Sequence, residues 1–583
     1  MPGFMGVIGL GERDCFSKET RSRLVRDRTS GASSFLERRT LNKFLKDKPF
    51  YEDENYILII EGVVLNRKKI ESDEKKDSFA ESIIACYEKS GEAFFRDFRG
   101  SFSGILCDKK KETWFIFTNH IGDKQVFYIQ TGRALVFGSE MGFVVDYCRR
   151  NHIRLTLDEA AAYMLLTYGF FIENHTLANE IQKLNAGHYL KIVHDKLEIK
   201  QFHQFRNEPD HKTSKADFIE GIDDLFRTAI KLQFEKDIEY GYRHITGLSG
   251  GLDSRMTVWV AHEMGYREML NTTFSQSNYW DETIAKRIAA DLKHEFVFKA
   301  LDNGLFLKNI DDIAKITYGG APYYGLAHGK GLYDLLDLDP YGIIHTGQIG
   351  DSIIGTFYSE PKSGLRHKIG DGAYSLTLIH RLADYAFVYE YPNQEIFCLY
   401  TRAFTGANQG LLDFQEKTES VSPFCNVEFL SFCYTIPVEL RYKHGLYFEW
   451  ILKKYPGAAN YIWEKTKRKI TEREQIVKLF GKRLPKEHFR EVLFKAFLKR
   501  IGIHIPRKDL QARVSAPSMN PLDDWYRNNP EIKSFMDHYF EDNVQLVTNH
   551  QLKNDCRSLY ENGVASEKIQ VLTLLSALKL IYN

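Results

Sequence analysis

The sequence predicts an α/β protein in two parts, a β-rich first part and a second part that combines a parallel sheet with a large helical region. Residues 1–205 contain many short runs of β-forming residues separated by turn residues. From residue 240 to about 355, strand-like and helix-like segments alternate, which is typical of a parallel, doubly wound sheet. Residues 370–583 have a mainly helical pattern, without a repeat or a low-complexity tract.

The first part is expected to be built from strands with a few helices between them. Phe79–Lys89 and Leu155–Thr167 have helical spacing, and Gly187–Gln204 has the pattern of a hairpin. The expected strands are Phe4–Leu10, Tyr56–Val64, Ser103–Cys107, Trp114–Thr118, Gln125–Gln130 and Ala134–Gly138.

A polar stretch, Arg206–Lys215, is the predicted linker, so we expect one domain over residues 1–205 and a second over 206–583. A helix is expected at Ala216–Lys231. Ligands of parallel sheets bind at the carboxyl ends of the strands, so we expect the functional residues at those ends. The expected strands are His244–Leu248, Met269–Phe274, Glu295–Lys299 and Gly342–Thr346, with helices at Met256–Met264 and Glu282–Leu292.

Composition excludes several classes of protein. The formal net charge is +1, which gives no whole-chain argument for nucleic acid or for a membrane surface. No window approaches 18 uninterrupted apolar residues, and the N-terminus has no signal-peptide pattern. The eight cysteines are scattered without CxxC pairs. We therefore expect a cytoplasmic protein without a disulfide framework.

The most informative segment is Ser249-Gly250-Gly251-Leu252-Asp253-Ser254, which follows the strand ending at Leu248 and precedes a helix-like run. Glycines let the backbone approach a phosphate, and the N–H groups of a helix N-terminus favour an anion. Ser249 and Ser254 can donate hydrogen bonds, and Asp253 can hold a cation that bridges phosphates. Because the loop lacks Lys, it differs from the GxxxxGK(S/T) loop and is typical of enzymes that cleave ATP between its α and β phosphates. The alternative is a plain glycine turn.

Two further segments end strands of the same predicted sheet. At Phe274 and Ser275 the backbone can contact adenine and ribose. His345-Thr346-Gly347-Gln348-Ile349-Gly350-Asp351 is a second glycine-rich loop with an Asp, which pyrophosphate release would need. Gly347 and Gln348 are expected to contact the nucleotide. Asp253 and Asp351 are expected to share one Mg²⁺ with ATP, because Mg²⁺ prefers carboxylates, phosphate oxygens and waters.

Two basic segments lie further along the chain. Trp463-Glu464-Lys465-Thr466-Lys467-Arg468-Lys469 could neutralise the charge of a departing pyrophosphate, with a solvated basic patch as the alternative. Lys482–Lys508 fits a solvated helix face better than a partner site.

Together these segments resemble the asparagine synthetase superfamily over both halves of the chain. The Ser249–Ser254 loop matches the family's Ser-Gly-Gly-Leu-Asp-Ser throughout, and Asp351 matches its second loop. The resemblance implies a glutaminase-type sandwich of two antiparallel sheets, followed by an ATP-pyrophosphatase domain that forms an acyl-adenylate. It also implies Lys467 as a catalytic residue beside Asp253 and Asp351, with Lys465 and Lys469 as alternatives. The N-terminal segments that carry the likeness are Gly3–Gly9, Phe98–Ser103, Asn119–Lys124 and Gly138–Glu140.

The sequence departs from the family in both halves. A working glutaminase of the family has Cys directly after the initiator Met, whereas this chain has Pro2, and its nearest thiol is Cys15. The family's Asn-Gly-Glu appears as Glu61-Gly62-Val63, so we expect an inactive glutaminase-like domain. The family's Gly-Glu-Gly-Ala-Asp-Glu appears as Gly347–Ser352, which leaves carboxylate activation in place but puts aspartate as a substrate in doubt.

We therefore expect an ATP- and Mg²⁺-dependent, AMP-forming carbon–nitrogen ligase whose nitrogen comes from ammonia or a substrate amine and not from glutamine. Its plan is similar to that of β-lactam synthetases and lasso-peptide cyclases, and amidation of a surface sugar stays open. The alternatives are an ammonia-dependent asparagine synthetase and, outside enzymes, a nucleotide-binding pseudoenzyme or scaffold.

The expected partners are a small-molecule or peptide carboxylate and an amine acceptor, without nucleic acid or membrane insertion. A homodimer and a partner from a biosynthetic gene cluster stay open. Glu395 and Arg402 are candidates for the acceptor pocket, because a guanidinium can hold a carboxylate. An ion pair within the protein explains them at least as well.

Overall fold

The computed structural model describes residues 2–9, 24–31, 33–132, 134–194, 196–472, 476–479, 482–485 and 518–583. Cys15 and most of the basic segment Lys482–Lys508 lie outside the described residues. Within the described part, no helix is long and apolar enough to cross a membrane, and the seven cysteines are unpaired thiols.

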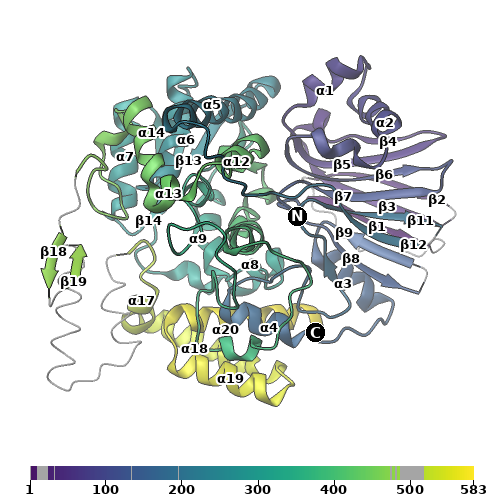
Figure 1. Ribbon diagram of the computed structural model, residues 1–583. Helices are drawn as coiled ribbons and strands as arrows, with labels where there is room; N and C mark the ends of the chain where they lie inside the picture. Colours follow the sequence, from purple (N-terminus) through teal and green to yellow (C-terminus); the bar gives the residue numbers. More distant parts are fainter. Residues whose placement is uncertain are drawn as a thin grey trace.

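The first part of the chain forms two six-stranded antiparallel sheets, as the resemblance implied (Figure 1). One sheet has the order β10 (Gln182–Lys183), β8 (Phe127–Thr131), β9 (Ala134–Gly138), β1 (Gly3–Ile8), β3 (Ser34–Leu41) and β2 (Leu24–Gly31). The other has the order β12 (Lys196–Gln201), β11 (His188–Val193), β7 (Thr113–Thr118), β6 (Gly100–Asp108), β5 (Tyr56–Val64) and β4 (Phe50–Glu52).

The elements of this part agree closely with the expected ones. The strands β5 and β9 have the predicted bounds, and the helix predicted over 79–89 is α2 (Phe79–Ser90). The helix predicted from Leu155 begins later, as α4 (Glu159–Thr167), because the Asp158 carboxylate caps it by accepting the Ala161 N–H at 3.0 Å. The hairpin of β2 and β3 and the helices α1 (Arg67–Glu74) and α3 (Met141–Arg150) were not expected.

The second part contains the predicted parallel sheet. Its order is β15 (Glu295–Ala300), β14 (Met269–Ser275), β13 (Arg243–Gly247), β16 (Tyr341–His345) and β17 (Ser420–Val421), and all neighbours are parallel. Within this sheet, β13 comes first in the sequence, yet it lies between β14 and β16. The strand order therefore reverses at β13. This reversal is the topological switch point of the sheet.

Helices pack on the parallel sheet and join its strands. The helix α5 (Lys215–Tyr240) contacts β13 and β16, and it is longer than the expected 216–231 segment. The helices α6 (Leu252–Glu263) and α7 (Trp280–Leu292) follow β13 and β14, as predicted. Further elements are α8 (Ile310–Thr317), α9 (Tyr324–Tyr333), α10 (Gly350–Ile353), α11 (Gln394–Cys398), α12 (Val427–Cys433), α13 (Val438–Arg441), α14 (Gly445–Lys454) and the hairpin β18 (Ile476–Leu479) and β19 (Lys482–Pro485).

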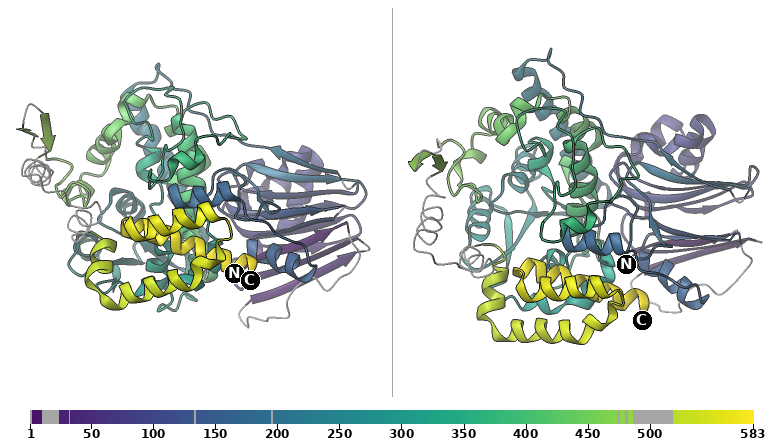
Figure 2. Two further views of the ribbon diagram at one scale, coloured as in Figure 1. Left: turned by 90° about the horizontal axis from the view of Figure 1, so that it is seen from below. Right: turned by 60° about the horizontal axis from the view of Figure 1, so that its bottom comes forward.

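The C-terminal helices lie beside the first part of the chain. Figures 1 and 2 show α18 (Pro530–Asn543), α19 (His550–Asn562) and α20 (Ala565–Tyr582), preceded by α17 (Leu522–Asn528), next to α4. The contact of α20 with α4 belongs to one apolar core that joins residues of both halves. The two halves therefore bury apolar surface against each other.

The expectation of a mainly helical segment from residue 370 is wrong over residues 370–393, which contain one short 3-10 turn at Ile379–Leu382. At the start of this segment, Gly370 and Gly372 have positive φ. An L-residue helix cannot continue through such positions.

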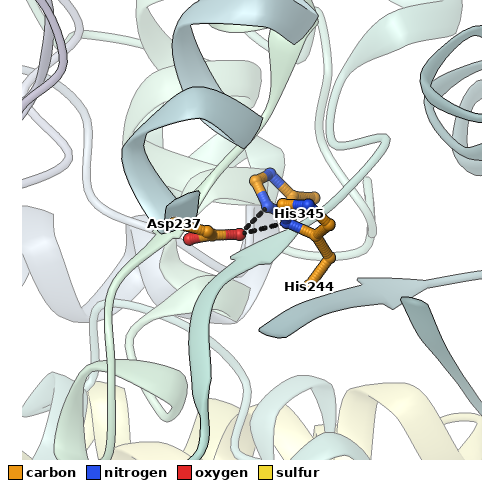
Figure 3. Close-up of side chains that lie close together, drawn as sticks. All are labelled: Asp237, His244 and His345. Atoms are coloured by element: carbon orange, nitrogen blue, oxygen red, sulfur yellow. Dashed lines mark hydrogen bonds and ion pairs between the residues drawn. The ribbon is translucent and has the colours of Figure 1, made fainter. Parts of the chain in front are cut away.

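A buried carboxylate ties α5 to the two strands at the switch point (Figure 3). Asp237 Oδ2 accepts hydrogen bonds from His244 Nδ1 and His345 Nε2, both at 2.8 Å, and Oδ1 accepts the Ile343 N–H at 2.8 Å. Burial alone would raise the pKa of Asp237, but His345 and His244 outweigh it and leave the pKa lowered. An ionised Asp237 therefore holds three donors from β13 and β16.

The same three side chains have ligand atoms close enough for a metal ion. A metal-bound imidazole normally donates its second ring N–H to a neighbouring acceptor. His345 Nδ1 is buried and has no partner among the described residues. The cluster is therefore explained by hydrogen bonds alone.

We predict that Asp237→Ala lowers the free energy of unfolding by about 3–5 kcal/mol, the range for removing one member of a buried charged cluster. The physical reason is that three buried N–H donors lose their acceptor. Urea denaturation measures the change, with Asp224→Ala on the exposed side of α5 as the matched control, expected within about 0.5 kcal/mol of the parent. Equal effects of the two substitutions would contradict the role of Asp237.

Candidate functional site

A cavity of about 510 Å³ lies at the carboxyl ends of the parallel strands. The loops after β13 and β16 border it, so it occupies the switch point, where such sheets bind ligands. Its volume is in the range of small-molecule sites. The predicted nucleotide-binding residues that line it are Leu248, Ser249, Gly251, Asp253, Ser254, Phe274, Gly347 and Gln348.

The first loop is shaped by its own hydroxyl groups. Ser254 Oγ accepts the Ser249 N–H at 3.0 Å, and Ser249 Oγ accepts the Gly251 N–H at 3.1 Å. The Gly250 N–H donates to Asp281 Oδ1 at 2.8 Å, so Gly250 shapes the loop and does not line the cavity. Helix α6 begins directly after Gly251, and the positive end of its dipole faces the cavity.

The second loop packs directly on the first. A Cβ atom at Gly347 would lie 2.2 Å from the backbone nitrogen of Ser254, and one at Gly350 would lie 2.6 Å from the carboxyl carbon of Asp253. Only glycine allows this approach without moving one of the loops. The loop also turns through a left-handed residue, Ile349, with φ 60°.

Asp253 and Asp351 are brought together by this packing. The Asp351 N–H donates to Asp253 Oδ2 at 2.8 Å, and the Tyr447 hydroxyl donates to Oδ1 at 2.9 Å. Burial, with the charge of Asp351 added, raises the pKa of Asp253 to about 8. No described Lys or Arg makes a hydrogen bond or ion pair with Asp253. Asp351 is exposed and does not line the cavity, but its charge acts on Asp253. Two carboxylates without a bound cationic side chain can hold a divalent cation.

The remaining predicted nucleotide contacts differ in their access to the cavity. Phe274 lines it and packs on His328 at a ring-centroid distance of 4.6 Å, and burial lowers the pKa of His328 to about 4. Ser275 is fully buried behind the strand end and does not line the cavity. Leu248 donates its N–H to the Thr272 carbonyl and so extends the sheet to the edge of the loop.

The predicted lysine segment lies against the first loop. It forms a tight turn, in which Trp463 pairs with Arg468 and Lys467 has φ 56°. The Glu464 N–H donates to the Gly250 carbonyl at 3.2 Å. Lys465, Lys467 and Lys469 do not line the cavity, and the first two are exposed. Of the three lysines, Lys465 is the one whose charge lowers the pKa of Asp253 against the effect of burial.

Three residues of the site were not expected. Asp281 orients Gly250, Tyr447 orients Asp253, and Arg255 donates to the carbonyls of Gly250 and Ile462 at 3.1 and 2.6 Å. Arg255 thus joins the first loop to the lysine segment. The position of Asp281 at the start of a helix was a usable signal, but nothing near Tyr447 in the sequence points to Asp253.

The two candidates for the acceptor pocket have different surroundings. Glu395 is fully buried and forms a two-pronged ion pair with Arg441, at 2.8 and 2.9 Å, which explains its burial without a ligand. Arg402 stacks 5.6 Å from the ring centre of Tyr374, which lines the cavity. Arg402 therefore stays a candidate at the cavity edge.

In the first part, Glu61-Gly62-Val63 stands where the family has its glutamine-binding Asn-Gly-Glu. Glu61 is buried, accepts a hydrogen bond from Thr40 at 3.0 Å and lies 3.3 Å from Lys48 Nζ. Gly62 has φ 102°, and Val63, which stands where the family has Glu, is fully buried. Pro2 precedes β1, where the family has its Cys.

A glutamine amidotransferase domain model matches residues 43–203. A provisionally named glutamine-hydrolysing asparagine synthetase 2 of Methanocaldococcus jannaschii is 25% identical over 54% of this chain and 62% of its own length. Glutamine-hydrolysing asparagine synthetase 2 of Bacillus subtilis is 30% identical over 40% of this chain and 33% of its own length. The chain thus spans less than two thirds of these relatives.

Solved structures match more weakly. The glutamine phosphoribosylpyrophosphate amidotransferase of B. subtilis, complexed with ADP and GMP, has a TM-score of 0.23 and 9% identity over 52% of this chain and 85% of its own. The NH3-dependent NAD synthetase of Campylobacter jejuni has a TM-score of 0.18 and 18% identity over 30% of this chain and 73% of its own. Both TM-scores lie below 0.5, so these two likenesses are weak. The amidotransferase domain match and these relatives, with the two antiparallel sheets and the parallel sheet that follows them, support membership of the asparagine synthetase superfamily.

Proposed function

We propose that the protein is an ATP-dependent, amide-forming ligase that activates a carboxylate as an acyl-adenylate and releases pyrophosphate. The observation that carries the proposal is the contact between the Ser249–Ser254 loop and the Asp351 loop at the switch point. This contact places serine hydroxyls, a helix N-terminus and the Asp253 carboxylate at one cavity, with Asp351 bonded to Asp253 through its backbone N–H. Phosphates and Mg²⁺ are the ligands that such groups hold together.

In the proposed reaction, a carboxylate oxygen attacks the α-phosphorus of ATP and pyrophosphate leaves. An amine then attacks the acyl carbon, AMP leaves, and the amine loses a proton. The first loop would hold the phosphates, and Asp253 with Asp351 would hold Mg²⁺, which neutralises their charge. A lysine of the 463–469 turn would stabilise the departing pyrophosphate. The sequence favours Lys467 for this role, whereas the charge acting on Asp253 favours Lys465.

The nitrogen source in this proposal is ammonia or an amine of the substrate. Support comes from Pro2 and from Glu61, whose carboxylate is engaged with Thr40 and Lys48. The reaction would then be similar in plan to that of β-lactam synthetases or lasso-peptide cyclases, or would amidate a surface sugar. An ammonia-dependent asparagine synthetase and a nucleotide-binding scaffold are the rivals. We propose a cytoplasmic setting, where ATP is supplied.

The first test is adenylation. We predict that Asp253→Asn lowers carboxylate-dependent ATP–pyrophosphate exchange by about two to three orders of magnitude, the scale for losing one preorganised electrostatic contact. The assay uses the full chain and a panel of carboxylates with ATP, Mg²⁺ and labelled pyrophosphate. Exchange that persists in the variant would contradict the role of Asp253, and a folded, ATP-binding parent without exchange on any carboxylate would favour the scaffold.

The Asp253 carboxyl group should make the affinity for Mg·ATP depend on pH. Since its pKa is raised to about 8, Asp253 is mostly protonated at pH 7, and Mg²⁺ binding must expel that proton. The affinity for Mg·ATP should therefore increase as pH rises from 6 to 8 and level off above. Asp253→Asn should bind more weakly and lose this part of the pH dependence.

The second test separates the lysines. We expect Lys465→Ala to lower product formation by about a hundredfold while ATP binding stays within about tenfold, because the contact is made mainly in the transition state. Lys467→Ala should be milder, and Lys469→Ala is the control on the same turn. A dead Lys467→Ala beside an active Lys465→Ala would restore the sequence-based choice. If all three variants are active, the turn is a solvated surface.

The third test concerns glutamine. We predict no enzyme-dependent glutamate from glutamine, with or without ATP and candidate substrates, because Pro2 stands where the family has its Cys and Val63 where it has its Glu. Glutamate is measured by a coupled assay with ammonium chloride as the parallel nitrogen source. Glutamate release near one turnover per second, an ordinary enzyme rate, would refute the assignment of nitrogen source.

A further inference from the structure

A second cavity, of about 250 Å³, lies outside the nucleotide site. Its walls come from Glu173, from the hairpin β11–β12 with the residues next to it, and from the segment 389–405. It opens toward an outer cleft of about 1030 Å³, since Gln204, Tyr389, Glu390 and Tyr391 line both. The volume of the inner cavity suits one small ring, and the cleft offers room for a longer ligand.

One wall of the cavity is firmly held. Glu173 is buried, and its two carboxylate oxygens accept the backbone N–H groups of Val388 and Tyr389 at 2.9 and 2.7 Å and the Tyr385 hydroxyl at 2.8 Å. Its charge is therefore satisfied by the protein. The bonds fix the segment that carries Tyr389 and Tyr391, so the aromatic wall is preformed.

His188 supplies an acceptor to the cavity. The side chain is 6% exposed, and its Nδ1 lies 2.9 Å from the Ala186 carbonyl oxygen. A carbonyl can only accept, so Nδ1 carries the proton, and Nε2 of the neutral ring has a lone pair. Burial lowers the pKa of His188, which keeps the ring neutral. No described residue donates to Nε2.

Tyr400 supplies a hydrogen-bond donor to the cavity, and two glutamine amides supply donors and acceptors. The Tyr400 oxygen accepts the Phe205 N–H at 3.0 Å, so its own hydrogen is left to donate. Gln201 and Gln204 line the cavity with side-chain amides that make no hydrogen bond to any described residue. The described residues that line this inner cavity include no Lys or Arg, whereas Arg206 and Arg366 line the outer cleft. The cavity therefore offers paired donors and acceptors without a cation for a phosphate or carboxylate.

We propose that this cavity binds an uncharged sugar ring, with the outer cleft taking further units of a saccharide. A sugar hydroxyl both donates and accepts, which matches His188, Tyr400 and the two glutamine amides. The apolar faces of a sugar ring can pack on the tyrosine rings, because aromatic side chains combine apolar area with a polar tip. An extended peptide would instead pair with a free strand edge. Of the edge strand β12, only the last residue, Gln201, lines the cavity.

The cavity lies on one side of the π-helix Leu399–Gly406, and the nucleotide site lies on the other. Tyr400 and Thr405 face the cavity, whereas Gly406 and the next residue, Ala407, line the nucleotide site. Such π-helical turns occur often at functional sites. A saccharide held here would sit one helix away from the proposed adenylation centre.

The test is binding of uncharged saccharides to the full chain. Glucose, galactose, N-acetylglucosamine and their di- and trisaccharides are screened by saturation-transfer NMR, and Kd is then measured by calorimetry. We expect at least one saccharide to bind, with a longer homologue binding more tightly. His188→Asn can keep a donor to the Ala186 carbonyl but removes the ring acceptor Nε2 from its place in the cavity, and Gln204→Ala removes an exposed amide. Each should weaken binding at least fivefold.

The matched control is His194→Asn, the same substitution at an exposed histidine of the same hairpin, which should leave Kd unchanged. Mg·ATP binding is measured on the same samples, so failure of the nucleotide site and failure of this proposal are told apart. The proposal is overturned if no saccharide binds to the folded protein, if both cavity variants bind like the parent, or if uncharged tripeptides bind and saccharides do not.

Discussion

The close approach of two glycine-rich loops at one switch point is the constraint on which the rest of the site depends. Gly347 and Gly350 lie so near Asp253 and Ser254 that any Cβ would collide. The approach lets the Asp351 N–H reach the carboxylate of Asp253, which lines the cavity. Burial and like charge then make the Asp253 carboxylate costly in isolation. A divalent cation with phosphates would remove that cost.

Two buried ionic clusters hold this arrangement in place. Asp237 joins α5 to the strands that deliver both loops. At the edge of the sheet, Glu419 precedes β17 and pairs with Lys48 and Lys124 of the first part, both at 2.7 Å. Burial alone would raise the pKa of Glu419, but the two lysines outweigh it and hold the pKa at about 2. Lys48 also pairs with Glu61, so the altered glutamine motif now belongs to the contact between the halves.

This second cluster gives the first part of the chain a structural role in the protein. Removing it would leave Glu419 as an unpaired buried charge and would expose the apolar core that α4 shares with α20. The first part therefore supports the sheet that carries Asp253 and Asp351.

The sequence predicted what depends on local pattern. The strand periodicity of 56–64 and the loop 249–254 are local, and both were located correctly. The hairpin of β2 and β3 is polar and only partly buried, so it lacks the apolar alternation that marks a strand. The bonds from Tyr447 and Asp281 join residues up to 194 positions apart, which no local pattern reveals. The preference for Lys465 over Lys467 depends on the charge that Lys465 exerts on Asp253 across the fold, which the sequence does not display.

The most direct measurement is a crystal structure of the full chain with a non-hydrolysable α,β-methylene analogue of ATP and Mn²⁺, located by its anomalous scattering. We expect a nucleotide whose phosphates contact the Ser249–Ser254 loop, with a Mn²⁺ ion coordinated by Asp253 and Asp351. A nucleotide outside the cavity, or a Mn²⁺ ion held without either carboxylate, would contradict it.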